Sequence, residues 1–325
     1  MTRFIPDPFV LLMVGAATLG LFVPDLGLPD GPLHLGLVTK IGISLVFFLH
    51  GANLAPSRLA SGLRNWRVHL LIQATTFVIF PFMGVIVFYG LTPVLPHPLL
   101  LGFFFLAALP STISSSVAMT ALARGNLPVA VFNATLSGIL GMVLTPAMIS
   151  FVTASGPANF SVLDAMKDIA LTLLAPFAVG QFARPVIGDL LAKHKWFLSR
   201  LDRTVILLIV FGSFASSTAG GVWSQFTPVQ FIVTVIVVII MLALAMVFTT
   251  LTSRRLAMPR EDEVASVFCG STKSLANGAP IAQILFAGSP TLGLLMLPLM
   301  LYHQLQLIVC ALLAERYARA AAETD

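Results

Sequence analysis

The sequence G-S-T-K-S-L-A-N-G-A-P occupies residues 270–280, in the middle of a long apolar segment. It places a lysine, Lys273, among hydroxyl side chains at a depth where a membrane helix is normally apolar. An earlier apolar segment contains P-S-T-I-S-S-S at residues 110–116, so that S-T-x-S occurs at 111–114 and again at 271–274. The two stretches predict a pair of helices that are interrupted part-way along their length.

The composition indicates the class of protein to which these segments belong. Hydrophobic residues make up 58% of the 325 residues and charged residues only 10%, whereas ordinary soluble domains carry about 25% charged residues. So few charges cannot cover the surface of a water-soluble protein of this size. A soluble enzyme, a nucleic-acid-binding protein and a disordered chain are therefore excluded, and we predict an all-α polytopic membrane protein.

Apolar segments long enough to cross a bilayer recur along the whole chain. A membrane helix needs about 20 mostly apolar residues, and such runs do not show the alternation of barrel strands. Between them lie only short connectors, so we expect no soluble domain. The sequence predicts ten helical spans, at 8–24, 33–52, 68–90, 99–122, 127–152, 163–184, 203–221, 229–252, 264–287 and 291–314.

The positions of lysine and arginine orient these spans. Most of the 18 basic residues, such as Arg3, Arg64 and Arg124, fall on the side that would carry both termini. Cytoplasmic loops of membrane proteins are enriched in Lys and Arg. We therefore predict a multi-pass protein of the cell membrane with both termini in the cytoplasm, and the net charge of +5 needs no nucleic-acid partner.

The predicted spans fall into two halves of five. The two interrupted segments are the fourth span of each half, and an odd number of spans inverts the second half in the membrane. We therefore predict two inverted repeats, residues 1–160 and 161–325, in a single transmembrane domain. Interrupted segments at matching places of inverted halves are typical of a transporter's binding site. The alternative is that the Ser and Thr residues only allow close helix packing.

Lys273 is the single charged residue predicted to lie deep in a span. A lysine at the centre of a membrane helix costs about 2.5–3.5 kcal/mol on insertion scales, so it needs a partner or a function. None of the 13 Asp and Glu residues is predicted to lie deep enough to neutralise it. Lys273 could bind an anionic solute, exchange a proton or replace a bound metal cation. The purely structural alternative is hydrogen bonding to the carbonyls of a broken helix.

The candidate site for solute and ion combines the polar residues of both breaks. The first break contributes Ser111, Thr112, Ser114, Ser115, Ser116 and Thr120. The second contributes Gly270, Ser271, Thr272, Lys273 and Ser274. Pro110, Gly278 and Pro280 are predicted to hold the breaks open, and Asn133 and His303 to flank them. Free N–H groups at half-helix N-termini favour anions, while unwound carbonyls favour cations.

Enzyme chemistry has no support in the sequence. The chain contains no H-E-x-x-H, G-x-S-x-G or Walker A pattern, and no pair of acids is predicted inside the membrane. We predict no catalytic residue, and no cofactor other than sodium or a proton as coupling ion. An ATP-driven pump is excluded because the sequence offers no nucleotide-binding domain.

Several of these stretches resemble the bile acid:sodium symporter family. They are N-W-R-V-H-L-L-I-Q-A-T-T-F-V-I-F-P at 65–81, A-R-G-N at 123–126 and F-N-A-T at 132–135 within 110–146, F-C-G-S-T-K-S-L-A-N-G-A-P at 268–280, and L-Y-H-Q-L-Q at 301–306. They look closest to the symporter-like branch shared by bacteria and eukaryotes. The resemblance implies panel and core domains, broken and crossing fourth and ninth helices, and sodium-coupled transport of organic anions by alternating access.

The chain departs from that family at the ninth-helix break. Better-known symporters place a Glu and a Gln there as sodium ligands, where this chain has Phe268 and Thr272. Ala130 and Ala134 also replace hydroxyl residues of the fifth helix. Sodium could still bind at Ser114, Ser115, Ser116 and Asn133. Alternatively, Lys273 acts as a built-in cation, which would suit proton coupling or plain anion transport.

These observations predict a secondary carrier that moves an organic anion or another small organic solute across a lipid bilayer. No protein partner can be inferred from the short connectors. Two alternatives remain open. One is a regulatory membrane protein that affects cytosolic calcium while transporting weakly or not at all. The other is a channel, for which the chain offers few polar span residues to line a pore.

Overall fold

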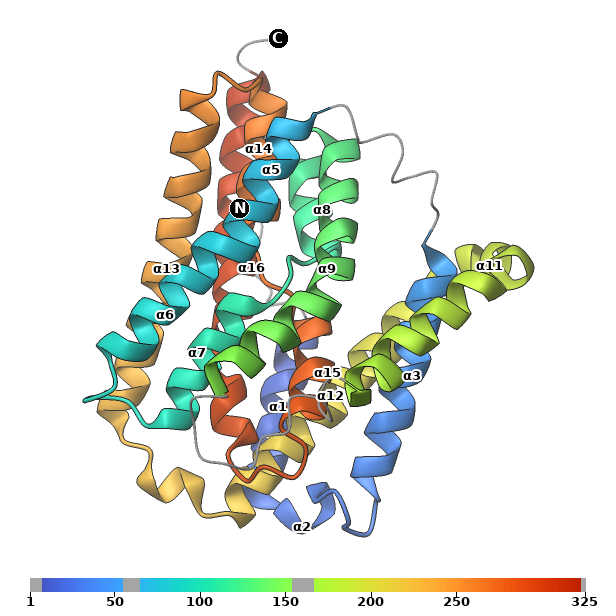
Figure 1. The fold of residues 1–325 in the computed structure, drawn as a ribbon, viewed down its shortest axis with the longest axis vertical. Helices are drawn as coiled ribbons and strands as arrows, with labels where there is room; N and C mark the ends of the chain where they lie inside the picture. Colours follow the sequence, from blue (N-terminus) through green and yellow to red (C-terminus); the bar gives the residue numbers. More distant parts are fainter. Residues whose placement is uncertain (1–7, 55–64, 154–166, 323–325) are drawn as a thin grey trace. The chain divides into compact units, whose positions relative to one another are not determined.

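The computed structural model describes residues 8–54, 65–153 and 167–322, and every regular element in those ranges is a helix (Figure 1). Arg3 and Arg64, which contribute to the predicted orientation of the chain, lie outside the described residues. Within these ranges, six helices are long and apolar enough to cross a membrane, namely Leu35–Asn53, Trp66–Gly90, Leu127–Thr153, Lys167–Leu191, Pro228–Arg255 and Leu292–Ala321. This confirms the prediction of an all-helical polytopic membrane protein.

The chain forms two compact units, and each contains segments from both halves of the sequence. Unit 1 consists of residues 1–54, 159–227 and 279–296. Unit 2 consists of residues 55–158, 228–278 and 297–325. Each unit therefore depends on contacts between residues that are far apart in the sequence.

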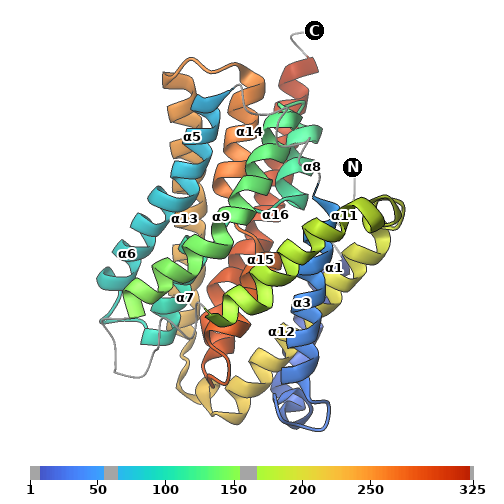
Figure 2. The same cartoon turned by 45° about the vertical axis from the view of Figure 1, so that its right-hand side comes forward.

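Unit 1 contains two helices that approach each other very closely. Its helices are α1 (Pro8–Phe22), α2 (Pro24–Gly27), α3 (Leu35–Asn53), α11 (Ala175–Lys193), α12 (Lys195–Ala219) and the short η3 (Val222–Gln225), together with the π-helical turn η2 (Ala170–Leu174), the end of α15 (Leu275–Leu285) and the first residues of α16 (Leu292–Ala322). Helices α3 and α11 lie side by side (Figure 2). A Cβ atom on Gly51 or Gly180 would collide with the backbone of the other helix, so glycine permits this contact.

Unit 2 contains both interruptions. Its elements are α5 (Trp66–Ala74), the π-helical turn η1 (Thr75–Ile79), α6 (Phe80–Gly90), α7 (His97–Ala108), α8 (Ser114–Leu122), α9 (Leu127–Thr153), α13 (Pro228–Arg255), α14 (Arg260–Ser271), the start of α15 (Leu275–Leu285) and most of α16 (Leu292–Ala322). Each predicted span overlaps a helix or, at 99–122 and 264–287, two helices separated by a break. The predicted interruptions are present at both positions.

The second break is shorter than the sequence predicted. Gly278 and Pro280 were expected to hold it open, but both lie inside α15, so that expectation was wrong. The helix resumes early because the Ser274 hydroxyl accepts a hydrogen bond from the Asn277 N–H at 3.1 Å. A serine that accepts this bond from the third helical residue is a favourable N-cap, and it starts α15 before the glycine and the proline are reached.

Two glycines of the second motif serve helix packing. A Cβ atom on Gly278 would lie 2.6 Å from Leu109 and 2.7 Å from Leu299. A Cβ atom on Gly270 would lie 2.8 Å from Thr249 of α13. Both positions therefore need a residue without a side chain where neighbouring elements approach closely.

Candidate solute and ion site

The first break separates α7 from α8, and side chains of α9 bind its exposed backbone. The Thr145 hydroxyl donates to the carbonyl of Ala108, the last residue of α7, at 2.7 Å. The Ser111 N–H donates to the Ser137 hydroxyl at 2.9 Å. A helix that ends inside the membrane leaves carbonyls and N–H groups without water to bind them. The hydroxyls of α9 satisfy two of these groups and so stabilise the interruption.

The two breaks are in direct contact. The Ser274 N–H donates to the Pro110 carbonyl at 2.9 Å. The hydroxyls of Ser111 and Thr272 lie 3.1 Å apart and share a hydrogen bond. The non-helical residues at 111–113 and 272–274 are therefore brought together at one point within unit 2.

Lys273 extends from the second break into a cage of backbone carbonyls and is fully buried. Its Nζ atom donates to the carbonyl oxygens of Leu109 at 2.7 Å, Ala107 at 2.8 Å and Thr76 at 3.0 Å. The same atom lies 4.1 Å from the centre of the Phe80 ring. An ammonium has three donors, and all three are used here. The aromatic face adds an attraction for the positive charge.

Two of the cage carbonyls come from the C-terminal end of α7. The Ala107 carbonyl would normally accept the N–H of residue 111, but the Ser111 N–H donates to the Ser137 hydroxyl instead. The C-terminal end of a helix carries a partial negative charge that favours cations. The end of α7 is thus suited to a cation, and the ammonium of Lys273 occupies it.

The third cage carbonyl is freed by a π-helical turn and a proline. In η1 the Phe80 N–H bonds to the Thr75 carbonyl, five residues earlier. The next carbonyl in that pattern belongs to Thr76 and would need the N–H of Pro81, which has none. Single π-helical turns are frequently found at functional sites. Here the turn leaves one carbonyl available to the Lys273 ammonium.

Helix α16 holds the backbone of the second break through two side chains. The Gln306 amide accepts the Lys273 N–H at 2.7 Å and donates to the Lys273 carbonyl at 2.9 Å. The Tyr302 hydroxyl donates to the Ser271 carbonyl at 2.6 Å. The Nδ1 atom of His303 lies 3.0 Å from Nε2 of Gln306, so His303 contacts a residue that holds the break. The Y-H-Q-L-Q segment therefore acts on the break directly through Tyr302 and Gln306.

The hydroxyls of the first break and α8 divide into a buried and an accessible group. Ser116 donates to the Thr112 carbonyl, and Thr120 donates to the Ser116 carbonyl at 2.7 Å. Both of these donors are fully buried. Ser114 is exposed, while Ser115 is half-buried with its hydroxyl 3.3 Å from that of Thr112. Accessible hydroxyls thus remain at the N-terminal end of α8, where the helix favours anions.

Asn133 belongs to a separate polar cluster that α9 forms with α5. Its Nδ2 lies 2.7 Å from Nδ1 of His69 and donates to the Val129 carbonyl at 2.9 Å. Gln73 donates to the carbonyl and to the side-chain oxygen of Asn133, both at 3.1 Å. Within the described ranges, no group of three or more His, Cys, Asp or Glu side chains could hold a metal ion.

A further polar cluster fixes the N-terminal end of α14. The two oxygens of Asp262 accept hydrogen bonds from Asn126 at 2.7 Å and from Asn65 at 3.1 Å. The neighbouring Glu263 is paired with Arg254 at 3.1 Å. The asparagines of the N-W-R and A-R-G-N motifs thus tie the start of α14 to the neighbouring ends of α5 and α9 within unit 2.

Sequence reasoning missed several residues that build this site. The three cage carbonyls belong to ordinary residues, and a backbone carbonyl leaves no mark in a sequence. Tyr302 and Gln306 could have been found, because a polar side chain inside a membrane helix needs a partner. Pro81 also carried a signal, since a proline inside an apolar helix frees an earlier carbonyl.

Comparison with known proteins identifies the family. The model of the SBF-like CPA transporter family matches residues 7–319, nearly the whole chain. The chain belongs to this family. It is therefore a multi-pass membrane protein of a transporter family, and the resemblance to bile acid:sodium symporters drawn from the motifs is confirmed.

Three relatives illustrate the similarity. "Uncharacterized protein PA2026" of Pseudomonas aeruginosa is 44% identical over 98% of this chain and 94% of its own length. "Putative symporter YfeH" of Escherichia coli (strain K12) is 40% identical over 96% and 93%. "Sodium/bile acid cotransporter 7" of Xenopus tropicalis is 31% identical over 94% and 88%.

Proposed function

We propose that this transporter is a secondary carrier that moves an organic anion or another small organic solute by alternating access. The observation that carries the proposal is the contact of two broken helices, with Ser111 and Thr272 sharing a hydrogen bond. A junction of half-helix ends offers fixed partial charges of both signs in a place without water. Such a junction supports solute binding rather than a structural role alone.

We further propose that Lys273 acts as a permanent internal cation at this junction. Its three donors are engaged with carbonyl oxygens at 2.7–3.0 Å, so none remains for a solute. This geometry favours replacement of a metal cation over direct binding of an anion. An anionic solute would instead meet the N-terminal end of α8, where Ser114 is exposed and Ser115 half-buried.

The proposed architecture is ten helices in two inverted repeats, residues 1–160 and 161–325, with both termini in the cytoplasm. The composition of the two units supports it. Unit 1 takes residues 1–54 from the first half and 159–227 and 279–296 from the second, and unit 2 takes 55–158, 228–278 and 297–325. The divisions after residue 54 and after residue 227 are parallel, as a panel and a core domain built from equivalent parts of both repeats would require, and segment 279–296 alone departs from this pattern.

Uptake by the purified chain in liposomes tests the function. Radiolabelled organic anions and small organic solutes would be offered with a sodium gradient, a proton gradient or neither. We expect uptake of at least one solute that is unaffected by replacing sodium with N-methylglucamine. Uptake that requires sodium would contradict the role proposed for Lys273, and an absence of uptake for every solute would favour a regulatory membrane protein. Ohmic ion currents would favour a channel.

A further inference from the structure

A cavity of about 150 Å³ lies within unit 1, beside the first turns of α3 and the start of the helix Lys167–Leu191. Its polar wall consists of Thr39, Lys40, Asp168, Thr172 and Gln283. An engineered cavity of about this volume accommodates a molecule the size of benzene. The cavity therefore has room for an organic solute of a few heavy atoms.

The wall carries one charge of each sign. Lys40 and Asp168 come from different helices, and both residues are exposed at the rim of the cavity. Within the described part of the chain they form no ion pair, since the pairs found there are Arg254–Glu263 and Arg319–Glu315. Two opposite charges that share a cavity without neutralising each other can each bind one end of a dipolar ligand.

The remaining wall offers hydrogen bonds and a small apolar surface. The Thr39 hydroxyl donates to the Leu35 carbonyl at 2.6 Å, so its oxygen is left to accept a bond. The half-buried Gln283 makes no side-chain hydrogen bond to another described residue, and its amide can both donate and accept. Ile43 and Ile284 also line the cavity and supply apolar surface for a short hydrocarbon segment.

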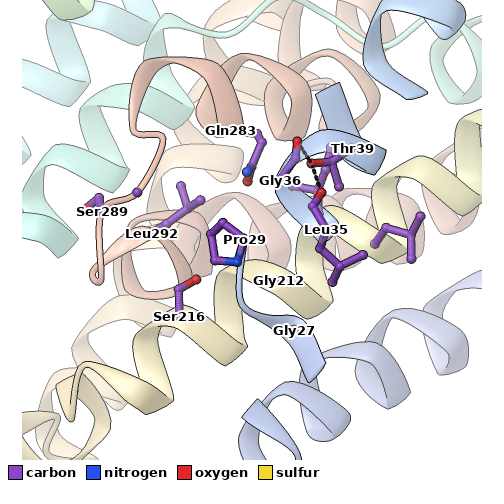
Figure 3. A pocket seen from close by; sticks show the side chains of 13 residues that line it. Gly27, Pro29, Leu35, Gly36, Thr39, Gly212, Ser216, Gln283, Ser289 and Leu292 are labelled. Carbon is purple, nitrogen blue, oxygen red and sulfur yellow. Dashed lines mark hydrogen bonds between the residues drawn. The ribbon is translucent and has the colours of Figure 1, made fainter. Parts of the chain in front are cut away.

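The same residues adjoin a second, narrower space. Figure 3 shows this neighbouring pocket, of about 10 Å³, around Pro29, Gly36, Thr39 and Gln283. A volume of that size accommodates at most about one water molecule. The larger cavity is therefore the part that can hold a solute, and Gln283 lies at the boundary of the two.

We propose that this cavity is a binding site for a small zwitterionic organic solute. The carboxylate of the ligand pairs with Lys40 and its ammonium with Asp168. A purely anionic molecule of the same size would leave Asp168 without a partner, and a purely cationic one would leave Lys40 without a partner. Both should therefore bind more weakly than a zwitterion. Resting on the proposed carrier function, we assign this zwitterion as the small organic solute that the carrier moves, which makes it a different ligand from the anion expected at the N-terminal end of α8.

Thermal unfolding of the full chain in nanodiscs tests the site. The probes are β-alanine, propionate and propylammonium at equal ionic strength. We expect only β-alanine to raise the unfolding midpoint in a saturable way. Lys40→Met and Asp168→Asn should each weaken its apparent affinity by about tenfold or more, the effect of losing one charge-assisted hydrogen bond. Equal stabilisation by propionate or propylammonium would overturn the proposal.

Lys167→Met provides the matched control. Lys167 is exposed and adjoins Asp168 in the sequence, but it does not line the cavity. The variant should therefore bind β-alanine as the wild type does, and a loss of affinity equal to that of Lys40→Met would refute contact between Lys40 and the ligand.

Binding of β-alanine without its uptake into liposomes would leave the site intact and refute its role for cargo. Uptake of another solute without β-alanine binding would refute the site and leave the carrier function intact.

Discussion

Replacing Lys273 by methionine should destabilise the chain strongly although it removes a buried charge. Methionine keeps much of the side-chain volume but leaves the carbonyls of Thr76, Ala107 and Leu109 without their donor. An unsatisfied buried polar group costs about 1–3 kcal/mol. The variant also no longer has to bury a charge, which offsets part of the cost of the three unsatisfied carbonyls. Combining the two effects, we expect a net loss of about 3 kcal/mol in the free energy of unfolding.

Thermal or denaturant unfolding in nanodiscs would measure this loss. Lys167→Met is the matched control, because Lys167 is exposed and its replacement should change stability by no more than about 0.5 kcal/mol. If Lys273→Met is as stable as the control, the carbonyl cage does not require a cation. The reasoning about the second break would then be wrong.

A shorter side chain allows a sharper version of this experiment. Lys273→Ala should leave the cage vacant, and ammonium or methylammonium chloride should restore stability, by about 2.7 kcal/mol at about a hundred times the dissociation constant. N-Methylglucamine chloride at the same ionic strength should have no effect. The wild type should respond to neither salt nor to sodium, because its own ammonium fills the cage. Stabilisation of the wild type by sodium would refute the internal cation.

Three further substitutions test how the second break is held. Gln306→Leu should lower the free energy of unfolding by about 2–4 kcal/mol, because it removes two hydrogen bonds to the broken backbone. Gln304→Leu is the control and should lower it little, because the buried Nε2 atom of Gln304 has no partner in the described residues. Ser274→Ala should cost about 1 kcal/mol through loss of the N-cap of α15. Gly278→Ala should cost about 1–3 kcal/mol because its Cβ meets two leucine side chains, whereas Gly15→Ala, with open space, should not destabilise. The unfolding midpoints of the variants check these predictions. Equal destabilisation by Gln306→Leu and Gln304→Leu would contradict the role of Gln306 in holding the break.

The break positions could be predicted because local chemistry determines them. Pro110 cannot donate a backbone hydrogen bond, and serine and threonine side chains can satisfy the backbone that a break exposes. The prediction failed at Gly278 and Pro280, which lie inside α15. Ser274 capped the helix before either residue was reached, and the glycine was needed for packing against leucines from distant segments.

Composition and local spacing were enough to establish the membrane class, the family motifs and the presence of one charge among apolar residues, since a sequence displays these properties directly. The role of that charge depends on the fold. The partners of Lys273 are the backbone carbonyls of residues 76, 107 and 109, and its own peptide is held by Gln306. Backbone carbonyls are chemically the same at every residue, so the packing of distant helices alone selects which of them meet an ammonium.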